Sequence, residues 1–263
     1  SDASGSRVAG QNLAQQLAGP DLKGVLILSD GLLVNGSDLV GGVNSVLGSS
    51  VVVTGGLAGD GSAFKRTWVL DALGMPCPGL VSAVGIYGDR VHVGHGSRGG
   101  WDPFGPERIV TRSKGNVLYA LDDKPALELY KTYLGERAVG LPATALLFPL
   151  TLRRAQSDQR VVRTVLAVDE ATQSMTFAGD IEQGAHAQLM RANFDRLVQG
   201  ASDAALMTSA RWGHSVPMVS IAISCVGRRL VLGERIEEET EAALDGLPQG
   251  TVQVGYYSYG EIS

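Results

Sequence analysis

Acidic and basic side chains beside glycines and turns are the residues of this sequence with the most evident binding chemistry. Asp30, Asp60 and Glu261 offer carboxylates, and Arg98 and Arg228 offer guanidinium groups. An amino acid or another zwitterion needs one group of each kind, a carboxylate for its amine and an arginine for its own carboxylate. A structural role is the alternative: Asp30 and Asp60 would cap turns, and Arg228 would pair with an acid of the framework.

Histidine and cysteine offer two further chemistries. The histidines are His92, His95, His186 and His214. His95 lies between two glycines and near Trp101, so it has the most room for a planar ligand and is the best candidate for an axial haem ligand. Cys225 lies just before Gly227 at the end of a predicted strand, which suits a nucleophile with His214 or His95 as its base. A small, buried and inert side chain is the favoured alternative for Cys225.

Residues 51–61 form the most unusual stretch of the chain. A β-branched run, which predicts a buried strand, is followed by Gly55, Gly56, Gly59 and Gly61. We expect the strand to end there in a tight loop whose backbone approaches a ligand closely. The alternative is a glycine-rich turn packed where no Cβ atom fits. The spacing of the glycines does not match a dinucleotide fingerprint, and no Lys-Ser or Lys-Thr pair follows them as in a phosphate loop.

Composition limits the classes of protein that this chain can belong to. It has 263 residues, 44% of them hydrophobic, which is enough to bury a full core. The formal net charge of −5 provides no basic surface for nucleic acid or for an anionic membrane. No apolar run approaches the roughly 18 residues of a membrane span, and the cysteines form no CxxC pair. We expect a cytoplasmic globular protein, with flanking segments missing because the chain begins without methionine.

The elements that would position the candidate residues occur twice in the same order. A predicted strand, helix and strand form a crossover unit near the start of the chain, and the order returns near its end. The predicted ranges are 24–29, 39–46 and 51–54 in the first unit, and 218–225, 233–244 and 252–254 in the second. Residues 35–38, beginning with Asn35, offer caps for the first helix, and Gly48 closes it. Hairpins are predicted at 80–95 and 161–178. We therefore expect a mixed α/β fold of two related units, 1–140 and 141–263, whose similar mixed sheets pack face to face with helices outside.

Loops at the carboxyl ends of these strands are the expected place for a ligand, as in open α/β sheets. They contain Asp30, Gly55, Asp60, Arg228, Tyr257 and Glu261. A further loop predicted at 97–106 carries Arg98 and Trp101 and is a candidate lid or pocket wall. A structural loop anchored by a buried tryptophan is the alternative.

Short motifs follow one another in a fixed order along nearly the whole chain. They are LSDG at 28–31, TGGLAGDGSAF at 54–64, LDDKPALELY at 121–130, SCVGR at 224–228, LGERIEEE at 232–239 and GYYSYGEI at 255–262. In that order they resemble the FIST domain family, with a FIST N-like unit followed by a FIST C-like unit. Members of the family carry a longer N-terminal part, so the first unit is expected to be incomplete at its N-terminus.

The resemblance implies a cytoplasmic sensory module of bacterial signal transduction, without catalysis of its own. Its ligand would be an amino acid or a similar metabolite. Its partner would be a signalling protein such as a histidine kinase, a chemotaxis transducer or a cyclic-dinucleotide enzyme, which receives a conformational change. Some bacterial relatives are haem proteins that respond to nitric oxide, so a haem sensor is one alternative and a cysteine-dependent enzyme is another. Neither nucleic acid nor a membrane is expected as a partner.

The sequence therefore predicts one ligand site assembled from distant parts of the chain. Its residues are Asp30, Gly55, Gly56, Gly59, Asp60, Arg98, Trp101, Cys225, Arg228, Tyr257 and Glu261. Replacing Arg228 or Asp60 by alanine is expected to abolish binding and to leave the fold intact.

Overall fold

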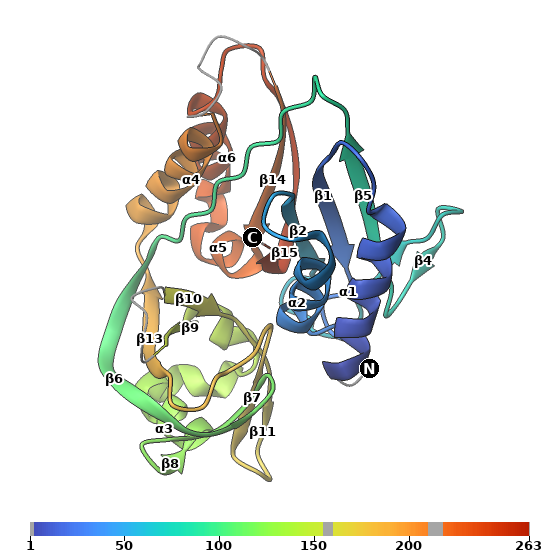
Figure 1. The fold of residues 1–263 in the computed structure, drawn as a ribbon. Helices are drawn as coiled ribbons and strands as arrows, with labels where there is room; N and C mark the ends of the chain where they lie inside the picture. Colours follow the sequence, from blue (N-terminus) through green and yellow to red (C-terminus); the bar gives the residue numbers. More distant parts are fainter. Residues whose placement is uncertain (1–2, 155–159, 210–217, 263) are drawn as a thin grey trace.

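The structure, a computed structural model, describes residues 3–154, 160–209 and 218–262. Two bodies form, one around a five-stranded mixed sheet and the other around an eight-stranded antiparallel sheet (Figure 1). The predicted mixed α/β fold class is confirmed. Of the described helices, none is both long and apolar enough to cross a membrane.

Two parallel pairs of strands join end to end in the five-stranded sheet. Its strands are β1 (Leu22–Ser29), β2 (Val52–Ala58), β5 (Val81–Tyr87), β14 (Val219–Cys225) and β15 (Val252–Ile262), in the order β14-β15-β2-β1-β5. β1 is parallel to β2 and β14 to β15, whereas β15 and β2 are antiparallel. Cys225 at the end of β14 and Ala58 at the end of β2 are both partners of Ser258. The carboxyl ends of the two parallel pairs therefore meet at Ser258.

This topology corrects the expected relation between the two crossover units. They share one sheet, so the prediction of two similar sheets packed face to face is wrong. The reason is the length of β15, which runs to Ile262, well past the predicted end at residue 254. Its first part pairs with β14 and its last part with β2, so this strand connects the two units directly.

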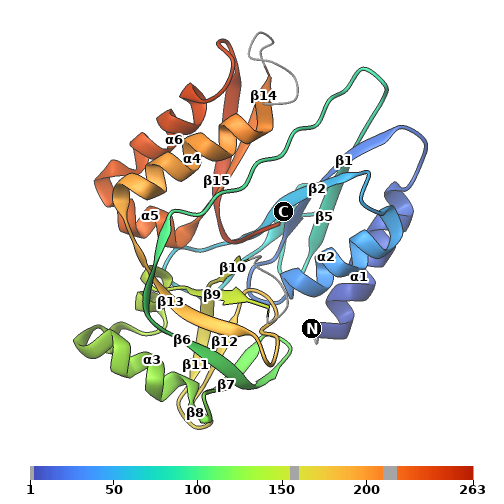
Figure 2. The ribbon, with the colours of Figure 1, turned by 60° about the vertical axis from the view of Figure 1, so that its left-hand side comes forward.

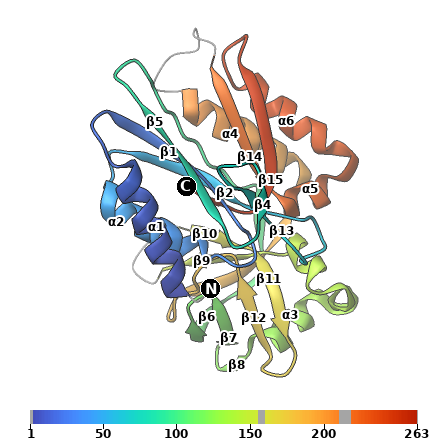
Figure 3. The ribbon, with the colours of Figure 1, turned by 90° about the vertical axis from the view of Figure 1, so that its right-hand side faces the viewer.

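Helices α1 (Ala3–Leu17) and α2 (Gly36–Leu47) pack on the β1–β2 part of the sheet (Figure 3). The side chain of Asn35 caps α2 by accepting a hydrogen bond from the backbone N–H of Asp38, and Gly48 ends the helix, as predicted. Val25, Ile27, Leu39, Val43 and Leu57 belong to the core between these helices and the strands.

Helices α4 (Phe194–Ser209), α5 (Val226–Leu232) and α6 (Ile236–Asp245) gather beside β14 and β15 (Figures 1 and 3). α5 follows β14 directly, and a short 3₁₀ helix, η3 (Gly233–Arg235), connects it to α6. The acidic segment predicted as a helix forms α6, which packs along α4.

The second body is an antiparallel sheet whose strands come from the middle of the chain. They are β6 (Trp101–Lys114), β7 (Val117–Leu121), β8 (Lys124–Pro125), β9 (Leu150–Arg153), β10 (Arg160–Arg163), β11 (Val165–Asp169), β12 (Ser174–Phe177) and β13 (His186–Ala192). The order is β10-β9-β13-β6-β7-β12-β11, with β8 beside β7. The helical elements α3 (Ala126–Leu134), η1 (Gly135–Gly140) and η2 (Ala143–Leu147) accompany it. Its strands come from both sides of residue 140, and the division of the chain there stays a prediction.

Two short connections complete the fold. β3 (Val69–Leu70) and β4 (Pro76–Cys77) form a small hairpin. Residues 91–100, which we call the strap, have no regular secondary structure and run from the end of β5 past α4 to β6 (Figures 1 and 2). The hairpin predicted at 80–95 is therefore wrong, because β5 pairs with β1 instead. The loop predicted at 97–106 is wrong in part, because β6 begins at Trp101.

Candidate functional site

A cleft of about 2020 Å³ is lined mostly by the five-stranded body and also by residues 160–164 of the second body. Its walls come from α2, the strap, α4 and α6, and from strands β2, β14, β15 and β10. Of the predicted binding residues, the cleft brings together Gly55, Arg98, Trp101, Cys225, Arg228, Tyr257 and Glu261. Asp30, Gly56, Gly59 and Asp60 are also described by the structure but do not line the cleft.

Glycines hold the strap against α4. A Cβ atom on Gly94 would lie 2.5 Å from the carbonyl oxygen of Thr208, and one on Gly96 would lie 1.9 Å from that of Ala204. Such contacts exist only because these strap residues have no side chain. The strap is therefore a packed wall of the cleft and not a loose loop above it.

One face of the β14–β15 pair gives the cleft an apolar wall. The parallel register places Ile221 opposite Val254 and Ile223 opposite Tyr256, and all of these residues line the cleft. Ile221 is 45% exposed and Val254 57% exposed. A continuous apolar face that neither helix nor loop covers is typical of a binding surface.

Glu261 brings a carboxylate to this wall. It lies opposite Gly56 of β2, is open to the cleft, and accepts a hydrogen bond of 2.9 Å at Oε1 from the Ser258 hydroxyl. The surrounding protein removes water from the carboxyl and so raises the pKa of Glu261. The hydrogen bond from Ser258 and the charge of Arg228 oppose that rise, whereas the charge of Glu239 adds to it. Within the described part of the chain, Glu261 has no ion-pair partner.

Tyr256 lies beside this carboxylate. Its ring lines the cleft, while its hydroxyl oxygen is buried and has no hydrogen-bond partner among the described residues. The absence of a side chain at Gly56 makes the room, because a Cβ atom there would lie 2.9 Å from the hydroxyl oxygen. Burial and the charge of Glu261 raise the pKa of Tyr256, so the phenol stays protonated.

Cys225 occupies the end of β14 as predicted, but its environment disfavours a nucleophile. Its sulfur accepts a hydrogen bond of 3.2 Å from the backbone N–H of Gly227 and so caps α5. Burial raises the pKa of the Cys225 thiol to about 12, and the charge of Glu261 adds to the rise. A reactive cysteine needs the opposite shift. His214, one of its two candidate bases, lies outside the described residues.

Arg228 is held by the protein itself. Its Nε donates to Glu239 Oε1 at 2.5 Å, and its Nη2 donates to the carbonyl oxygen of Leu197. Both charged side chains are less than a tenth exposed, and the Ser224 hydroxyl also donates to Glu239. This arrangement corresponds to the structural alternative for Arg228, pairing with an acid of the framework, although the residue also lines the cleft.

Asp30 and Asp60 cap turns, which is the structural role predicted from the sequence as the alternative to ligand binding. Asp30 accepts hydrogen bonds from the backbone N–H groups of Leu32, Leu33 and Gly79, and Asp60 from those of Phe64, Lys65 and Arg66. The Tyr259 hydroxyl also donates to Asp60. Partial burial of the Asp60 carboxyl acts to raise its pKa, but the hydrogen bonds from these donors outweigh burial and lower the pKa of Asp60. Their oxygen atoms are thus already occupied by the chain.

The glycines after residue 54 lie in a strand, not in a loop. β2 continues through Gly55 and Gly56 to Ala58, so the predicted end of the strand is wrong. Gly55 has a φ of 150°, and a Cβ atom on it would lie 1.9 Å from the carbonyl oxygen of Ile27. The sequence predicted, as the alternative to a binding loop, glycines at positions where no Cβ atom fits. Gly55 and Gly56 occupy such positions. Gly59 follows the strand, and a Cβ there would lie 2.9 Å from Val226 Cγ2.

Of the remaining predicted residues, Arg98 and Trp101 lie on the strap or at its end, and Tyr257 lies on β15. Trp101 is only 8% exposed and packs with Leu197 and Leu232, so it anchors the end of the strap. Arg98 is exposed on the strap. The Arg229 guanidinium lies 5.0 Å from the ring centre of Tyr257.

His95 also lines the cleft, as the strap places it there. Burial lowers the pKa of His95, so its imidazole is neutral at neutral pH. Nowhere among the described residues do three His, Cys, Asp or Glu side chains gather closely enough to hold a metal ion.

The sequence did not single out Ile221, Ile223, Val254 or Tyr256 as site residues. Their signal was present, because apolar residues alternate along 219–223 and 252–256. Alternation alone indicates one buried face of a strand. It does not show that this face is left open to a cleft.

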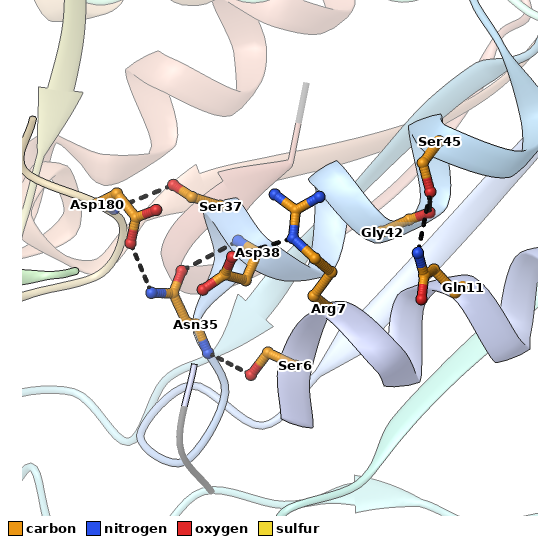
Figure 4. Close-up of polar contacts among 9 residues, drawn as sticks. All are labelled: Ser6, Arg7, Gln11, Asn35, Ser37, Asp38, Gly42, Ser45 and Asp180. Atoms are coloured by element: carbon orange, nitrogen blue, oxygen red, sulfur yellow. Dashed lines mark hydrogen bonds and ion pairs between the residues drawn. The ribbon is translucent and has the colours of Figure 1, made fainter. Parts of the chain in front are cut away.

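A set of polar contacts, which we call the polar joint, connects the two bodies (Figure 4). Asn35 Nδ2 donates to Asp180 Oδ1 at 2.7 Å, and the backbone N–H of Asp180 donates to Ser37 Oγ at 3.1 Å. Ser6 Oγ accepts from the backbone N–H of Asn35 at 3.0 Å. Burial and the charge of Asp180 raise the pKa of Asp38, against the effect of Arg7. The start of α2 is thus tied both to α1 and to the second body.

Comparison with known proteins gives two adjoining family matches. The FIST N domain model matches residues 1–124, and the FIST C domain model matches residues 126–263. Neither the curated proteins nor the solved structures contain a significant match.

Proposed function

Because the chain belongs to the FIST family of sensory domains in signal transduction, we propose that it binds a small molecule in the cleft and signals its presence to a partner. The ligand is an amino acid or a similar metabolite. The setting is the bacterial cytoplasm, and the partner is a signalling protein such as a histidine kinase, a chemotaxis transducer or a cyclic-dinucleotide enzyme. The chain itself performs no catalysis.

One observation carries this proposal: a roomy cleft combines an open apolar wall with a carboxylate that forms no ion pair with any described residue. Ile221 and Val254 form part of the wall, and Glu261 supplies the carboxylate. Ligand sites typically join an apolar lining to a few polar groups that set orientation. The raised pKa of the Cys225 thiol supports binding over cysteine chemistry in the same cleft.

The fold offers two routes from the cleft to a partner. The strap lines the cleft and continues directly into β6 of the second body. α2 also lines the cleft, and the joint through Asn35, Ser37 and Asp180 ties its start to the same body. A ligand that favours one arrangement of these walls would shift the relative position of the bodies, which is the change a partner detects.

The test is a thermal-shift screen of amino acids and related metabolites, followed by calorimetry of any compound that raises the melting temperature. Ile221→Trp places a bulky ring on the open apolar wall and should reduce or abolish the shift. Val139→Trp is the matched control, because Val139 is 94% exposed and does not line the cleft. The proposal fails if no compound binds, or if Ile221→Trp binds as the unaltered protein does.

A haem sensor is the second candidate, and His95 is the observation that favours it. Its imidazole lines the cleft and is neutral, which is the form that coordinates iron. The volume and the apolar wall of the cleft also fit a planar macrocycle. Bound haem would supply the iron that takes up nitric oxide. An absorption titration with haemin should give a Soret band that is lost in His95→Ala and kept in His186→Ala; no band in the unaltered protein rules this candidate out.

A further inference from the structure

We propose that the cleft binds a short peptide in extended form, which adds a strand to the free edge of β15. The inference rests on the proposed sensory function. Among amino acids and similar metabolites it names one class of ligand, a short peptide. Peptide bonds are neutral, so this recognition does not depend on either Glu261 or Arg163, the charged groups on opposite sides of the question of ligand charge.

The free edge of β15 is the first step of the argument. β15 pairs with β14 from Val252 to Ser258, but with β2 only from Ser258 to Ile262. Figure 2 shows the β14–β15 pair leaning away from β1 and β2. Along residues 252–257, the side of β15 that faces away from β14 therefore pairs with no described strand. An inner strand of the sheet is thus an edge strand over about half of its length.

Gln253 and Gly255 present the unpaired backbone groups of this edge. The N–H of Val252 donates to the carbonyl oxygen of Met218, just before β14. Since successive residues of a strand direct their N–H and C=O groups to opposite sides, Gln253 and Gly255 direct theirs away from β14. Both residues line the cleft, and Gly255, whose surface is backbone, is exposed. An extended ligand can therefore reach these groups.

The second step is that this edge is unprotected. Free edges are usually blocked by a charged side chain, a proline or a bulge. Residues 252–257 contain neither a charged residue nor a proline, and the shift in register comes only after Ser258. In addition, Oε1 of Gln253 is buried and has no hydrogen-bond partner in the part of the chain that the structure describes. Unpaired polar groups in a partly enclosed site favour a partner that satisfies them.

The size of the cleft is the third step. Sites for small molecules usually have volumes of about 300–1,000 Å³, whereas this cleft has about 2020 Å³, so a single amino acid would leave most of it to water. Six residues of strand, the length of the free edge, occupy roughly 20 × 10 × 5 Å, or about 1,000 Å³. The strap, α2 and α4 wall the cleft, and the space between them suits one extended segment, whereas a second copy would bring a whole sheet.

The apolar wall is the fourth step. An added strand alternates its side chains between the two faces of the sheet. On one face, Ile221, Ile223 and Val254 lie where alternate side chains of the peptide would rest. In strand addition, backbone hydrogen bonds supply affinity and contacts of this kind supply sequence preference. We therefore expect bound peptides to carry apolar residues at every second position.

A library of hexapeptides tests the proposal on the full chain. Its members are N-acetylated and C-amidated, with valine, leucine, isoleucine or phenylalanine alternating with serine, threonine, lysine or glutamate. The peptide that binds most tightly by isothermal titration calorimetry is then remade with methyl groups on alternate backbone nitrogens, in one analogue at the odd positions and in the other at the even positions. Only one set faces β15, so one analogue should lose at least about tenfold more affinity than the other, because it loses the hydrogen bonds.

Gln253→Pro tests the same contact from the side of the protein. Proline removes the N–H that faces the peptide and none that the β14–β15 ladder uses. Peptide binding should be at least about tenfold weaker than in Gln253→Thr, which changes the same side chain but retains the N–H. Thermal melting shows whether both variants fold. If Gln253→Pro does not, amide exchange in the unaltered protein decides, because bound peptide should slow exchange at Gln253 and Gly255 by about tenfold or more.

The outcomes separate this inference from the function beneath it. Two methylated analogues that bind alike, or Gln253→Pro that binds as Gln253→Thr does, overturn strand addition and leave the sensory function standing. A free metabolite that binds in an Ile221→Trp-sensitive manner, while no hexapeptide binds, has the same meaning. Failure of the hexapeptides and of the whole metabolite screen counts against the proposed function as well.

Discussion

Gly96 of the strap lies so close to Ala204 of α4 that a Cβ atom on residue 96 would stand 1.9 Å from the Ala204 carbonyl oxygen. That oxygen belongs to the helix backbone and cannot turn aside as a flexible side chain could. The position of the strap, and with it one wall of the cleft, thus depends on a missing side chain.

Gly96→Ala should force the strap away from α4. We expect a loss of about 1–3 kcal/mol in the free energy of unfolding, as for other overpacked contacts, together with weaker ligand binding because the wall moves. Gly99→Ala is the matched control, since a Cβ atom on Gly99 meets nothing within 4 Å. Urea unfolding measures the first effect and calorimetry the second; equal stability of the two variants would contradict the packing described.

Arg228→Ala should unfold the protein more readily, which revises the expectation that this variant leaves the fold intact. It leaves the Glu239 carboxylate buried without its partner, and breaking a buried pair in this way costs about 3–5 kcal/mol. The measurement is urea unfolding. Arg235→Ala, in the exposed pair with Glu238, should change little, and Arg228→Met combined with Glu239→Leu should recover much of the loss. If Arg228→Ala alone is as stable as the unaltered protein, the ion pair between Arg228 and Glu239 does not have this structural role.

Asp60→Asn tests a pH-dependent contribution to stability. The folded state lowers the pKa of Asp60 below its ordinary 3.8, so the ionised form stabilises the fold above that pH, and the gain disappears as the pH falls through the folded pKa. An amide nitrogen cannot accept the bonds from Lys65 and Arg66. Asp60→Asn should therefore be less stable at pH 7, by roughly 1–3 kcal/mol, with the gap narrowing below about pH 4. A gap that stays constant down to pH 2.5 would contradict this assignment.

Iodoacetamide labelling tests the environment of Cys225. With its thiol pKa near 12, almost no thiolate forms at pH 7.5. A Cys77→Ser variant, which retains only Cys225, should react at least about 100-fold more slowly than free cysteine, whose pKa is near 8.5. A Cys225→Ser variant, which retains the partly exposed Cys77, is the comparison. Rapid labelling at Cys225 would restore the cysteine-dependent enzyme as a candidate.

Local elements followed from the sequence more readily than their assembly. Asn35 and Gly48 bound α2 as predicted, because a side-chain cap and a positive φ are properties of individual residues. The pairing of β15 with β2 joins residues from opposite ends of the chain, and no local pattern specifies it. The strap illustrates a second limit: its alternation around His92 is typical of a strand, yet β5 already pairs with β1, and the glycines favour packing on α4.

The candidate site shows the same division. The order of the elements placed Cys225, Arg228 and Glu261 near one another, and all three line the cleft. Their states depend on neighbours that composition does not reveal: Glu239 engages Arg228, whereas Glu261 is left with a hydroxyl. For Asp30 and Asp60, the sequence favoured ligand binding and gave turn capping only as the alternative. An aspartate that caps a turn and one that binds a ligand look the same in a sequence.

The place of β15 between β14 and β2 also sets the order in which the chain can fold. Until the ribosome has delivered residues 252–262, β2 has an unpaired edge and β14 lacks its neighbour. The first parallel pair must therefore wait with an open edge while all the residues between β2 and β15 are made, and in that state strands can join the wrong partner. Contacts so distant in sequence also slow folding, so a growing chain released early should aggregate, and chaperones that shield nascent strands should raise its yield.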